Sequence, residues 1–248
     1  MISIQKILIA TMIALMFSST AFAEKLVIGM ATAFKPYNYS EKKQWTGIDV
    51  EIIEEVFRRL GINVKFREYP WARVLLMAEV GKIDGILSVY CNDRHSFLEN
   101  TNEPSYSVKI SFFSLKTDNP KITELDDFNG KSVGVNRGNY YAKYIENYEK
   151  IKIFKSVDVK MLVRQLYKKR IDFALHEVGP FLYYSKEIGF KECFDEVYEL
   201  KSDSVCMAFS KKALGSRSKE LADKVSMIIH QLKSEGYIQK VTEKYLGK

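Results

Sequence analysis

Two side chains of opposite charge stand at the ends of apolar runs that have the composition of buried strands. Arg94 follows the run 83–89, and Glu177 ends the run 171–177. A guanidinium offers a planar fork of donors that matches a carboxylate, whereas a carboxylate can pair with an ammonium. Each residue also has an ordinary explanation. Arg94 can pair with a neighbouring surface acid, and Glu177 can be a helix N-terminal acid that the helix dipole favours.

Aromatic and polar side chains stand near the same chain positions. Phe34 and Tyr37 belong to an aromatic loop after the first apolar run, and Trp71 stands at a predicted helix start. Aromatic rings offer stacking surface to cationic or apolar ligands, although ordinary core packing also explains each ring. The turn that contains Asn139 and Tyr140 follows another strand signal, and its backbone N–H groups could receive an anion.

The sequence contains no arrangement of residues that is typical of catalysis or metal binding. The patterns G-x-S-x-G, H-E-x-x-H and the Walker loop are absent. His95, His176 and His230 are too far apart for metal-ligand spacing. Cys91 could act as a nucleophile only with a histidine base, and its one evident candidate is His95, which is nearly adjacent in sequence. We therefore predict no catalytic residue, no metal and no cofactor.

Residues 25–89 alternate between strand and helix signals. The strand signals lie at 25–32, 62–69 and 83–89, and the helix signals lie at 48–61 and 70–82. Asp49 can cap the first helix, and the preceding stretch 34–47 is predicted to be a polar, aromatic loop. Such alternation implies a mostly parallel sheet with right-handed crossovers. In such sheets ligands bind beyond the carboxyl ends of the strands, where Arg94 stands.

The alternation repeats in the second half of the chain. The strand signals lie at 131–138, 151–156, 171–177 and 204–212, and the helix signals lie at 139–150, 157–170, 178–189, 216–236 and 237–248. Glu177 therefore stands at a strand end that corresponds to the position of Arg94 in the first unit. The sequence predicts the α/β class, with two lobes of similar build.

The first 23 residues have the pattern of a secretory signal peptide. Lys6 precedes the apolar run 7–17, and the small residues at 21 and 23 form a cleavage signal. The apolar run is shorter than the roughly 18 residues that a membrane-spanning helix needs. We predict cleavage before Glu24 and export to the periplasm.

The charge of the chain indicates a solvated basic surface. The 38 Lys and Arg residues and 31 Asp and Glu residues give a formal net charge of +7 at pH 7, and the basic residues are scattered among acids. An exported chain without a basic run is not expected to bind nucleic acid.

Three cysteines leave at least one thiol unpaired or paired between chains. Cys193 and Cys206 are close in sequence, and an oxidising compartment permits a bridge between them. The alternative is that all three cysteines, including Cys91, are reduced and buried. The sequence does not decide between these states.

Five loose motifs, in order along most of the mature chain, resemble a known family. They are FKPYNY with GIDVEI, LLMAEVGKIDGI, NDRHSFLENTNEPSY, DDFNGKSVGVNRG and LKSEGYIQKVTEKY. Together the motifs are similar to those of the bacterial solute-binding proteins of the amino-acid type, the periplasmic receptors of ABC importers. The resemblance implies two lobes, each a mostly parallel sheet flanked by helices, joined by two hinge strands. Lobe 1 would comprise 24–106 plus 206–248, and lobe 2 would comprise 107–205.

The resemblance also implies residue roles. In this family the arginine that matches Arg94 clamps the ligand α-carboxylate, the acid that matches Glu177 receives the α-ammonium, and the aromatic residue that matches Phe34 stacks on the ligand side chain. This chain departs from the family where Asn139 and Tyr140 replace the usual threonines. It also departs where the stretch 84–94 is shorter than usual and its Ser/Thr-rich lining is reduced to Ser88. The candidate ligand-binding residues are Arg94, Glu177, Phe34, Tyr37, Trp71, Ser88, Asn139 and Tyr140.

The resemblance predicts a monomeric periplasmic binding protein rather than an enzyme. It would capture a small polar, amino-acid-like ligand between closing lobes and deliver it to the membrane permease of an ABC importer. One alternative is a cyclohexadienyl-dehydratase-like enzyme on the same fold, with Glu177 as general acid. Another is a ligand-sensing protein whose partner is a membrane receptor.

Overall fold

The computed structural model describes residues 25–31, 34–92, 95–137, 140–146, 148, 150–190 and 192–246. The predicted signal peptide and the predicted site residues Arg94 and Asn139 lie outside the described residues. Tyr140 is described in its backbone, but its side chain also lies outside the description.

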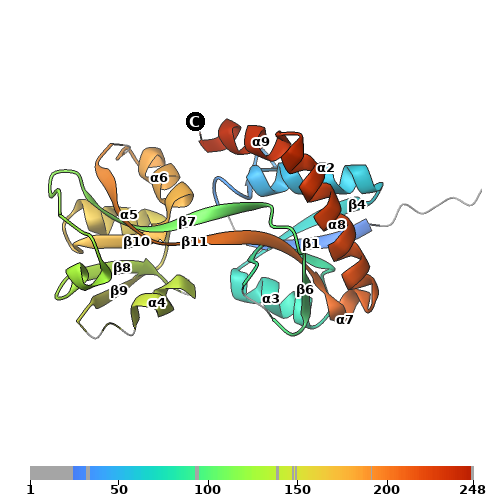
Figure 1. Cartoon of the computed structure of the whole chain (residues 1–248), viewed down its shortest axis with the longest axis horizontal. Helices are drawn as coiled ribbons and strands as arrows, with labels where there is room; N and C mark the ends of the chain where they lie inside the picture. Colours follow the sequence, from blue (N-terminus) through green and yellow to red (C-terminus); the bar gives the residue numbers. More distant parts are fainter. Residues whose placement is uncertain are drawn as a thin grey trace, which may run out of the picture.

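The elements form two lobes, and two long strands, β7 (Tyr106–Leu115) and β11 (Phe194–Ser210), run between them (Figure 1). The first lobe contains β1 (Lys25–Ala31), β2 (Tyr39–Glu41), β3 (Gln44–Thr46), α2 (Ile48–Leu60), β4 (Asn63–Tyr69), α3 (Trp71–Glu79), β5 (Gly85–Tyr90), β6 (Leu98–Asn100), α7 (Lys211–Leu214), α8 (Arg217–Ser234) and α9 (Tyr237–Leu246). The second lobe contains η1 (Leu125–Phe128), β8 (Ser132–Asn136), η2 (Tyr140–Ala142), α4 (Lys143–Glu146), β9 (Lys152–Ser156), α5 (Val159–Tyr167), β10 (Phe173–Glu177) and α6 (Val178–Glu187).

The main sheet is parallel within each lobe and antiparallel where the lobes join. Its order is β4-β1-β5-β11-β7-β10-β8-β9, with β6 paired to β11. β1 pairs in parallel with β4 and β5, and β8 pairs in parallel with β9 and β10. β7 and β11 pair with each other and with their other neighbours in antiparallel fashion. The predicted two-lobed α/β fold is confirmed, while the residue boundaries of the lobes stay a prediction.

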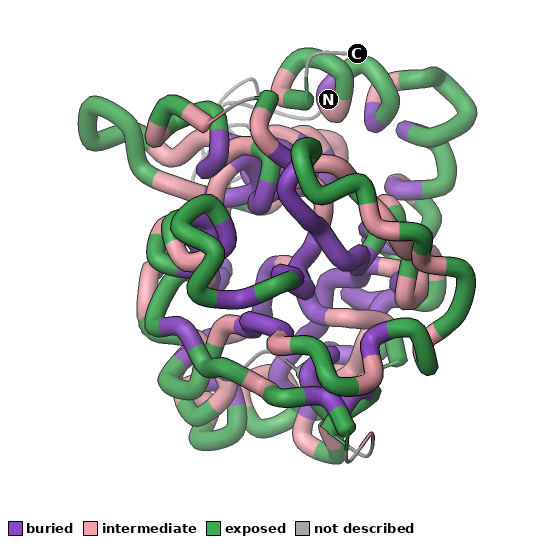
Figure 2. Tube along the Cα trace, turned by 90° about the vertical axis from the view of Figure 1, so that its left-hand side faces the viewer, coloured by how far each residue is buried: buried purple, intermediate pink, exposed green. Residues whose placement is uncertain are grey.

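Helices cover both faces of the sheet in each lobe. In the first lobe, residues of α2, α8 and α9 form one buried cluster, and α3 and β5 contribute to another. In the second lobe, the adjacent residues Phe112 and Phe113 of β7 point to opposite faces and join two separate clusters, one of them with α5 and α6. Figure 2 shows the buried segments in the interior and the exposed segments around them.

The structure differs from the sequence prediction in several elements. The predicted loop 34–47 contains the β2–β3 hairpin, and β7 was not predicted as a strand. The predicted helix 139–150 contains only η2 and α4 among its described residues. β11 begins ten residues earlier than the predicted strand 204–212. Its first half pairs only with β7, and its charged residues, of which Glu196 and Glu199 are exposed, interrupt the apolar pattern by which a strand is recognised.

Gly47 ends the hairpin segment and precedes α2. Its φ is +121°, and a Cβ at this position would lie 2.2 Å from the Tyr37 carbonyl oxygen. Gly47 is the N-cap residue of α2, so the prediction that Asp49 caps this helix is wrong. The close approach fixes the segment that carries Phe34 and Tyr37 against the start of α2.

We expect Gly47→Ala to lower the free energy of unfolding by about 3 kcal/mol, because the new methyl group meets backbone that cannot move aside. Gly61→Ala is a matched control. Gly61 ends the same helix with a φ of +68°, but nothing lies within 4 Å of a Cβ there, so a loss of about 1 kcal/mol is expected. Urea unfolding measures both changes, and equal losses at the two glycines would refute the steric argument.

Candidate functional site

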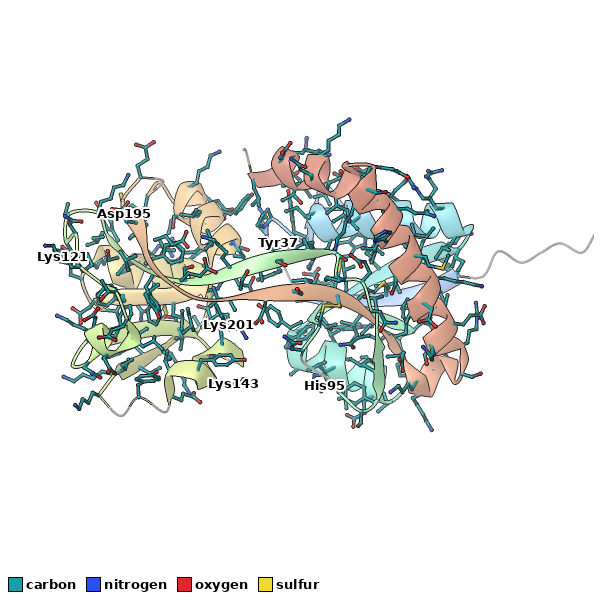
Figure 3. The ribbon with its side chains drawn as sticks, in the orientation of Figure 1. Tyr37, His95, Lys121, Lys143, Asp195 and Lys201 are labelled. Carbon is teal, nitrogen blue, oxygen red and sulfur yellow. A yellow bond between two sulfur atoms is a disulfide. The ribbon has the colours of Figure 1, made fainter. Side chains whose placement is uncertain are left out.

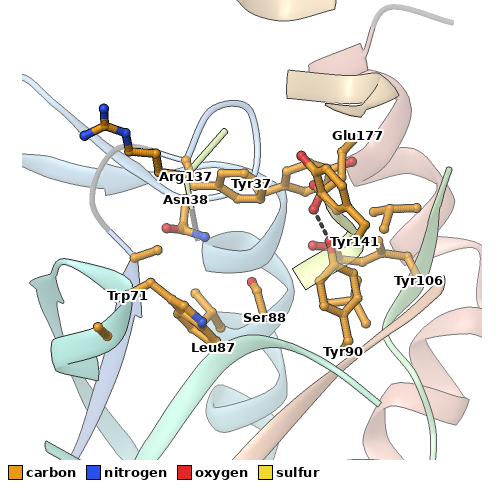
Figure 4. Close-up of a pocket in the computed structure, with 15 residues that line it drawn as sticks. Tyr37, Asn38, Trp71, Leu87, Ser88, Tyr90, Tyr106, Arg137, Tyr141 and Glu177 are labelled. Atoms are coloured by element: carbon orange, nitrogen blue, oxygen red, sulfur yellow. Dashed lines mark hydrogen bonds between the residues drawn. The ribbon is translucent and has the colours of Figure 1, made fainter. Parts of the chain in front are cut away.

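A cavity of about 440 Å³ lies between the two lobes, beside β7 and β11 (Figure 4). Its wall includes residues from the segment after β1, from α3, β5, β7 and β11, and from the strand ends of the second lobe. The lining residues are Ala31, Phe34, Tyr37, Asn38, Trp71, Ala72, Leu87, Ser88, Tyr90, Tyr106, Val108, Arg137, Tyr141, Glu177 and Val205. The cavity therefore lies at the carboxyl ends of parallel strands, where open α/β sheets bind ligands.

The cavity brings together the predicted site residues that the structure describes in full. They are Phe34, Tyr37, Trp71, Ser88 and Glu177. The cavity is also lined by five residues that were not predicted as site residues: Asn38, Tyr90, Tyr106, Arg137 and Tyr141. Two of these could have been predicted, because Tyr90 is two residues after Ser88 in one strand and Arg137 is two residues before Asn139 in the predicted turn.

Glu177 is the acidic group of the cavity wall. It is the last residue of β10 and the N-cap residue of α6, yet its side chain makes no capping hydrogen bond. Instead the Tyr90 hydroxyl of the first lobe donates to Glu177 Oε1 of the second lobe (Figure 4). The pKa of Glu177 is raised from 4.5 to about 7, mainly by burial and also by the nearby Asp49 carboxylate, while the Tyr90 hydrogen bond opposes the shift.

A β-bulge directs Ser88 to the cavity. Cys206 of β11 pairs with Val89, and Ala208 pairs with Ile86, so two residues of β5 oppose one residue of β11. Ser88 has a φ of +59°, which is a left-handed conformation within a strand. Both bulge residues, Leu87 and Ser88, consequently line the cavity.

Behind this wall lies a second buried carboxyl group, that of Asp49. It accepts hydrogen bonds from Asn38 Nδ2 at 3.0 Å, from the Ser88 hydroxyl and from the Tyr106 hydroxyl. Asp49 is 4% exposed and does not line the cavity, whereas all three donors do. Burial raises the pKa of Asp49, and the three hydrogen bonds act against that shift.

Three aromatic rings are stacked along one side of the cavity. Tyr37 lies between Phe34 and Tyr106, with ring centroids 5.4 Å away on each side. Tyr37 is in the middle part of the molecule between the lobes (Figure 3). A Cβ at Gly179 of α6 would lie 2.8 Å from the Tyr37 hydroxyl oxygen, so this glycine allows the two lobes to approach closely.

An ion pair also joins the lobes outside the cavity. Lys35 Nζ of the first lobe lies 3.6 Å from Glu187 Oε1 at the end of α6. The same ammonium lies 5.5 Å from the centre of the Tyr183 ring. The segment that carries Phe34 and Tyr37 therefore contacts α6 both inside and outside the cavity.

The disulfide bond lies in the first lobe. Cys91, directly after β5, is bonded to Cys206 of β11, and Cys193 is free and partly buried. The considered bridge between Cys193 and Cys206 is therefore wrong, as is the state with three reduced thiols. The bulged pairing of β5 with β11 brings Cys91 and Cys206 together across 115 residues, a relation that closeness in sequence cannot reveal.

Two further classes of feature are absent from the described residues. No helix in this part of the chain is long and apolar enough to cross a membrane. Nor does the described part hold a group of three or more His, Cys, Asp or Glu side chains that could bind a metal ion.

The order of the motifs along the chain has a counterpart in a known family. Residues 26–248 match the family described as bacterial extracellular solute-binding proteins, family 3. The chain belongs to this family. Among curated relatives, the L-cystine-binding protein TcyA of Bacillus subtilis (strain 168) is 24% identical over 225 residues, which are 90% of this chain and 81% of that protein.

Two further comparisons extend over the same part of the chain. The probable amino-acid-binding protein YxeM of Bacillus subtilis (strain 168) is 25% identical over 229 residues, which are 90% of this chain and 84% of that protein. A crystal structure of a histidine kinase sensor domain with similarity to periplasmic binding proteins has a TM-score of 0.76 at 21% identity, and covers 90% of this chain and 96% of that one. The latter likeness shows the fold shared with the solute-binding family.

Proposed function

We propose that this chain is a periplasmic binding protein that captures an amino-acid-like ligand between its lobes and delivers it to an ABC-type importer. Family membership and the amino-acid-binding relatives support this function. The main structural support is the buried carboxyl group of Glu177, which lies in the wall of an interlobe cavity lined by aromatic rings. We further propose that the protein acts as a monomer after cleavage of its signal peptide.

In this proposal Glu177 receives the ligand ammonium, and Phe34 and Trp71 offer their ring faces to the rest of the ligand. Ser88 contributes a hydroxyl oxygen from the bulge. Arg94 holds the ligand carboxylate by analogy with the family. Ligand binding closes the lobes by a hinge movement of the two connecting strands.

Isothermal titration with the twenty proteinogenic L-amino acids and L-cystine tests the proposal. We expect at least one of them to bind with a dissociation constant in the micromolar range or below. If the folded protein binds none of them better than millimolar, the amino-acid proposal is wrong.

An enzymatic function on the same fold has one observation in its favour. The pKa of Glu177, raised by burial to about 7, would suit a general acid at neutral pH. Assays of prephenate and arogenate turnover decide this alternative, because a binding protein converts neither compound. A sensory function, in which a membrane receptor takes the place of the importer, would be indicated by a neighbouring gene for a sensor kinase rather than a permease.

A further inference from the structure

Asp49 is placed to control the cavity without contacting what the cavity holds. It lies in the first turn of α2, while its three hydrogen-bond donors belong to other elements: Asn38 to the segment before β2, Ser88 to β5 and Tyr106 to β7. Each of these donors lines the cavity, and Asp49 does not. One buried carboxylate therefore orients three separate pieces of the wall.

The direction of these hydrogen bonds determines what the wall offers to a ligand. An ionised carboxylate only accepts, so the Ser88 and Tyr106 hydroxyls must each use their single proton on Asp49. Their oxygens keep only acceptor capacity for the cavity. The Tyr90 hydroxyl is committed in the same way, because it donates to Glu177. Hydroxyls that could have held a ligand carboxylate are thereby turned into acceptors.

The charges around the cavity also favour a cationic group over a carboxylate. Asp49 and Glu177 are two buried acids, one from each lobe. Among the described lining residues Arg137 is the cation, but it is exposed, and its guanidinium lies on the far side of the cavity from Glu177 (Figure 4). The wall around Ser88, Tyr90 and Tyr106 therefore attracts positive charge and donor groups.

We infer that Asp49 is a specificity-determining positioning residue: by taking the protons of the Ser88 and Tyr106 hydroxyls, it makes this wall select a cationic, donor-rich group and reject a carboxylate. The inference rests on the proposed function in one respect, namely that the interlobe cavity is the ligand site. It adds the chemical class of the group bound at this wall and the residue that enforces the choice.

The variant Asp49→Asn tests whether Asp49 sets the hydrogen-bonding character of the wall. The amide oxygen of asparagine can still accept from Asn38 and Ser88, while its NH₂ group replaces the oxygen that accepts from Tyr106. The Tyr106 hydroxyl must then accept from the amide, and its own proton becomes free for the cavity. The variant keeps the volume of the side chain, and its folding is checked by its thermal unfolding temperature.

Two small probes read out the result without any knowledge of the natural ligand. We would titrate methylguanidinium chloride and sodium acetate, at matched ionic strength, into the ¹⁵N-labelled protein and follow the amide resonances of Ser88, Tyr90 and Tyr106, which belong to this wall. In the wild type we expect methylguanidinium to shift these resonances and acetate to leave them unchanged. In Asp49→Asn we expect methylguanidinium binding to weaken about tenfold and acetate binding to appear.

Three further variants test whether the hydrogen bonds of Asp49 cause these changes in probe binding. Asp49→Asn combined with Tyr106→Phe should lose the acetate binding again, because the freed proton is gone. Ser88→Ala, which keeps the Asp49 charge, should also weaken methylguanidinium binding. Asp223→Asn, the same charge change on the exposed face of α8, should alter neither probe.

The inference is overturned if methylguanidinium does not shift the cavity resonances of the wild type. It is also overturned if Asp49→Asn leaves methylguanidinium binding unchanged or brings no acetate binding, or if Ser88→Ala leaves methylguanidinium binding unchanged, since the Asp49 hydrogen bonds would then not set the choice. Asp49-dependent methylguanidinium binding by a protein that binds no amino acid would refute the proposed function and support this inference.

Discussion

Glu177→Gln is expected to weaken the binding of an ammonium-bearing amino acid by about 100-fold. The substitution keeps the shape of the side chain but removes the buried charge that would pair with the ammonium, and a buried partner of this kind is worth several kcal/mol. Isothermal titration with the best ligand of the amino-acid panel measures the loss. Glu199→Gln, which neutralises an exposed acid of β11 that pairs with Lys109, should leave affinity unchanged. Equal affinities of the wild type and Glu177→Gln would remove Glu177 from the site.

The same substitution should change how the stability of the ligand-free protein depends on pH. Burial raises the pKa of Glu177 from 4.5 to about 7. Between these values the folded chain holds a proton that the unfolded chain has released, so the contribution of Glu177 to stability is present below pH 4.5 and is lost as the pH rises through 7. The loss between pH 5 and pH 8 is on the order of 2–3 kcal/mol, and Glu177→Gln should not show it.

The neighbouring His176 acts in the opposite direction. Burial lowers its pKa from 6.5 to about 4, so its contribution to stability increases as the pH rises from 4 to 6.5. The wild type alone would therefore show two effects that largely cancel. Urea unfolding of both proteins at pH 5 and pH 8 isolates Glu177 as a difference, and parallel pH profiles of the two proteins would contradict the raised pKa.

Removal of the Cys91–Cys206 disulfide is expected to lower the free energy of unfolding by about 4 kcal/mol. The bond closes a loop of 115 residues, and a cross-link over a loop of this length restricts the unfolded chain strongly. The double variant Cys91→Ala with Cys206→Ala, measured by urea unfolding, tests the expectation. Cys193→Ser, which removes the free thiol, should change stability by about 1 kcal/mol or less.

Reduction provides a second measure of the same bond. Dithiothreitol should destabilise the wild type by a similar amount and leave the double variant unchanged, because only the wild type has a disulfide to lose. A wild type that is as stable reduced as oxidised would show that the native contacts alone hold β5 and β11 together.

The alternation of strands and helices was predictable because it is a local property. The apolar face of α2 and the buried runs of β5 and β10 are visible as periodicities of a few residues. The first half of β11 was not predictable in this way. It is an edge in the second lobe, and its strand character comes from pairing with β7, which is distant in sequence.

The cavity shows the same division between local and distant information. Glu177 was predicted from its position at a strand end and Ser88 through the resemblance, and Tyr90 could have followed from strand alternation. Asp49 was misassigned as a helix cap, because an acid near a predicted helix start has that local meaning. Its actual partners include Ser88 and Tyr106, 39 and 57 residues away, which only the folded sheet brings to it.

The contacts between the lobes imply that bonds between protein groups, inside and outside the cavity, contribute to the measured affinity for a ligand. The Tyr90–Glu177 hydrogen bond and the Lys35–Glu187 ion pair hold the lobes together from protein groups alone. They help to set the fraction of molecules that is already closed, and the apparent dissociation constant is the intrinsic one divided by that fraction. Because a partly exposed ion pair contributes about 1 kcal/mol at most, variation at Lys35 or Glu187 can adjust affinity about fivefold while the cavity wall, and thus the choice of ligand, stays the same.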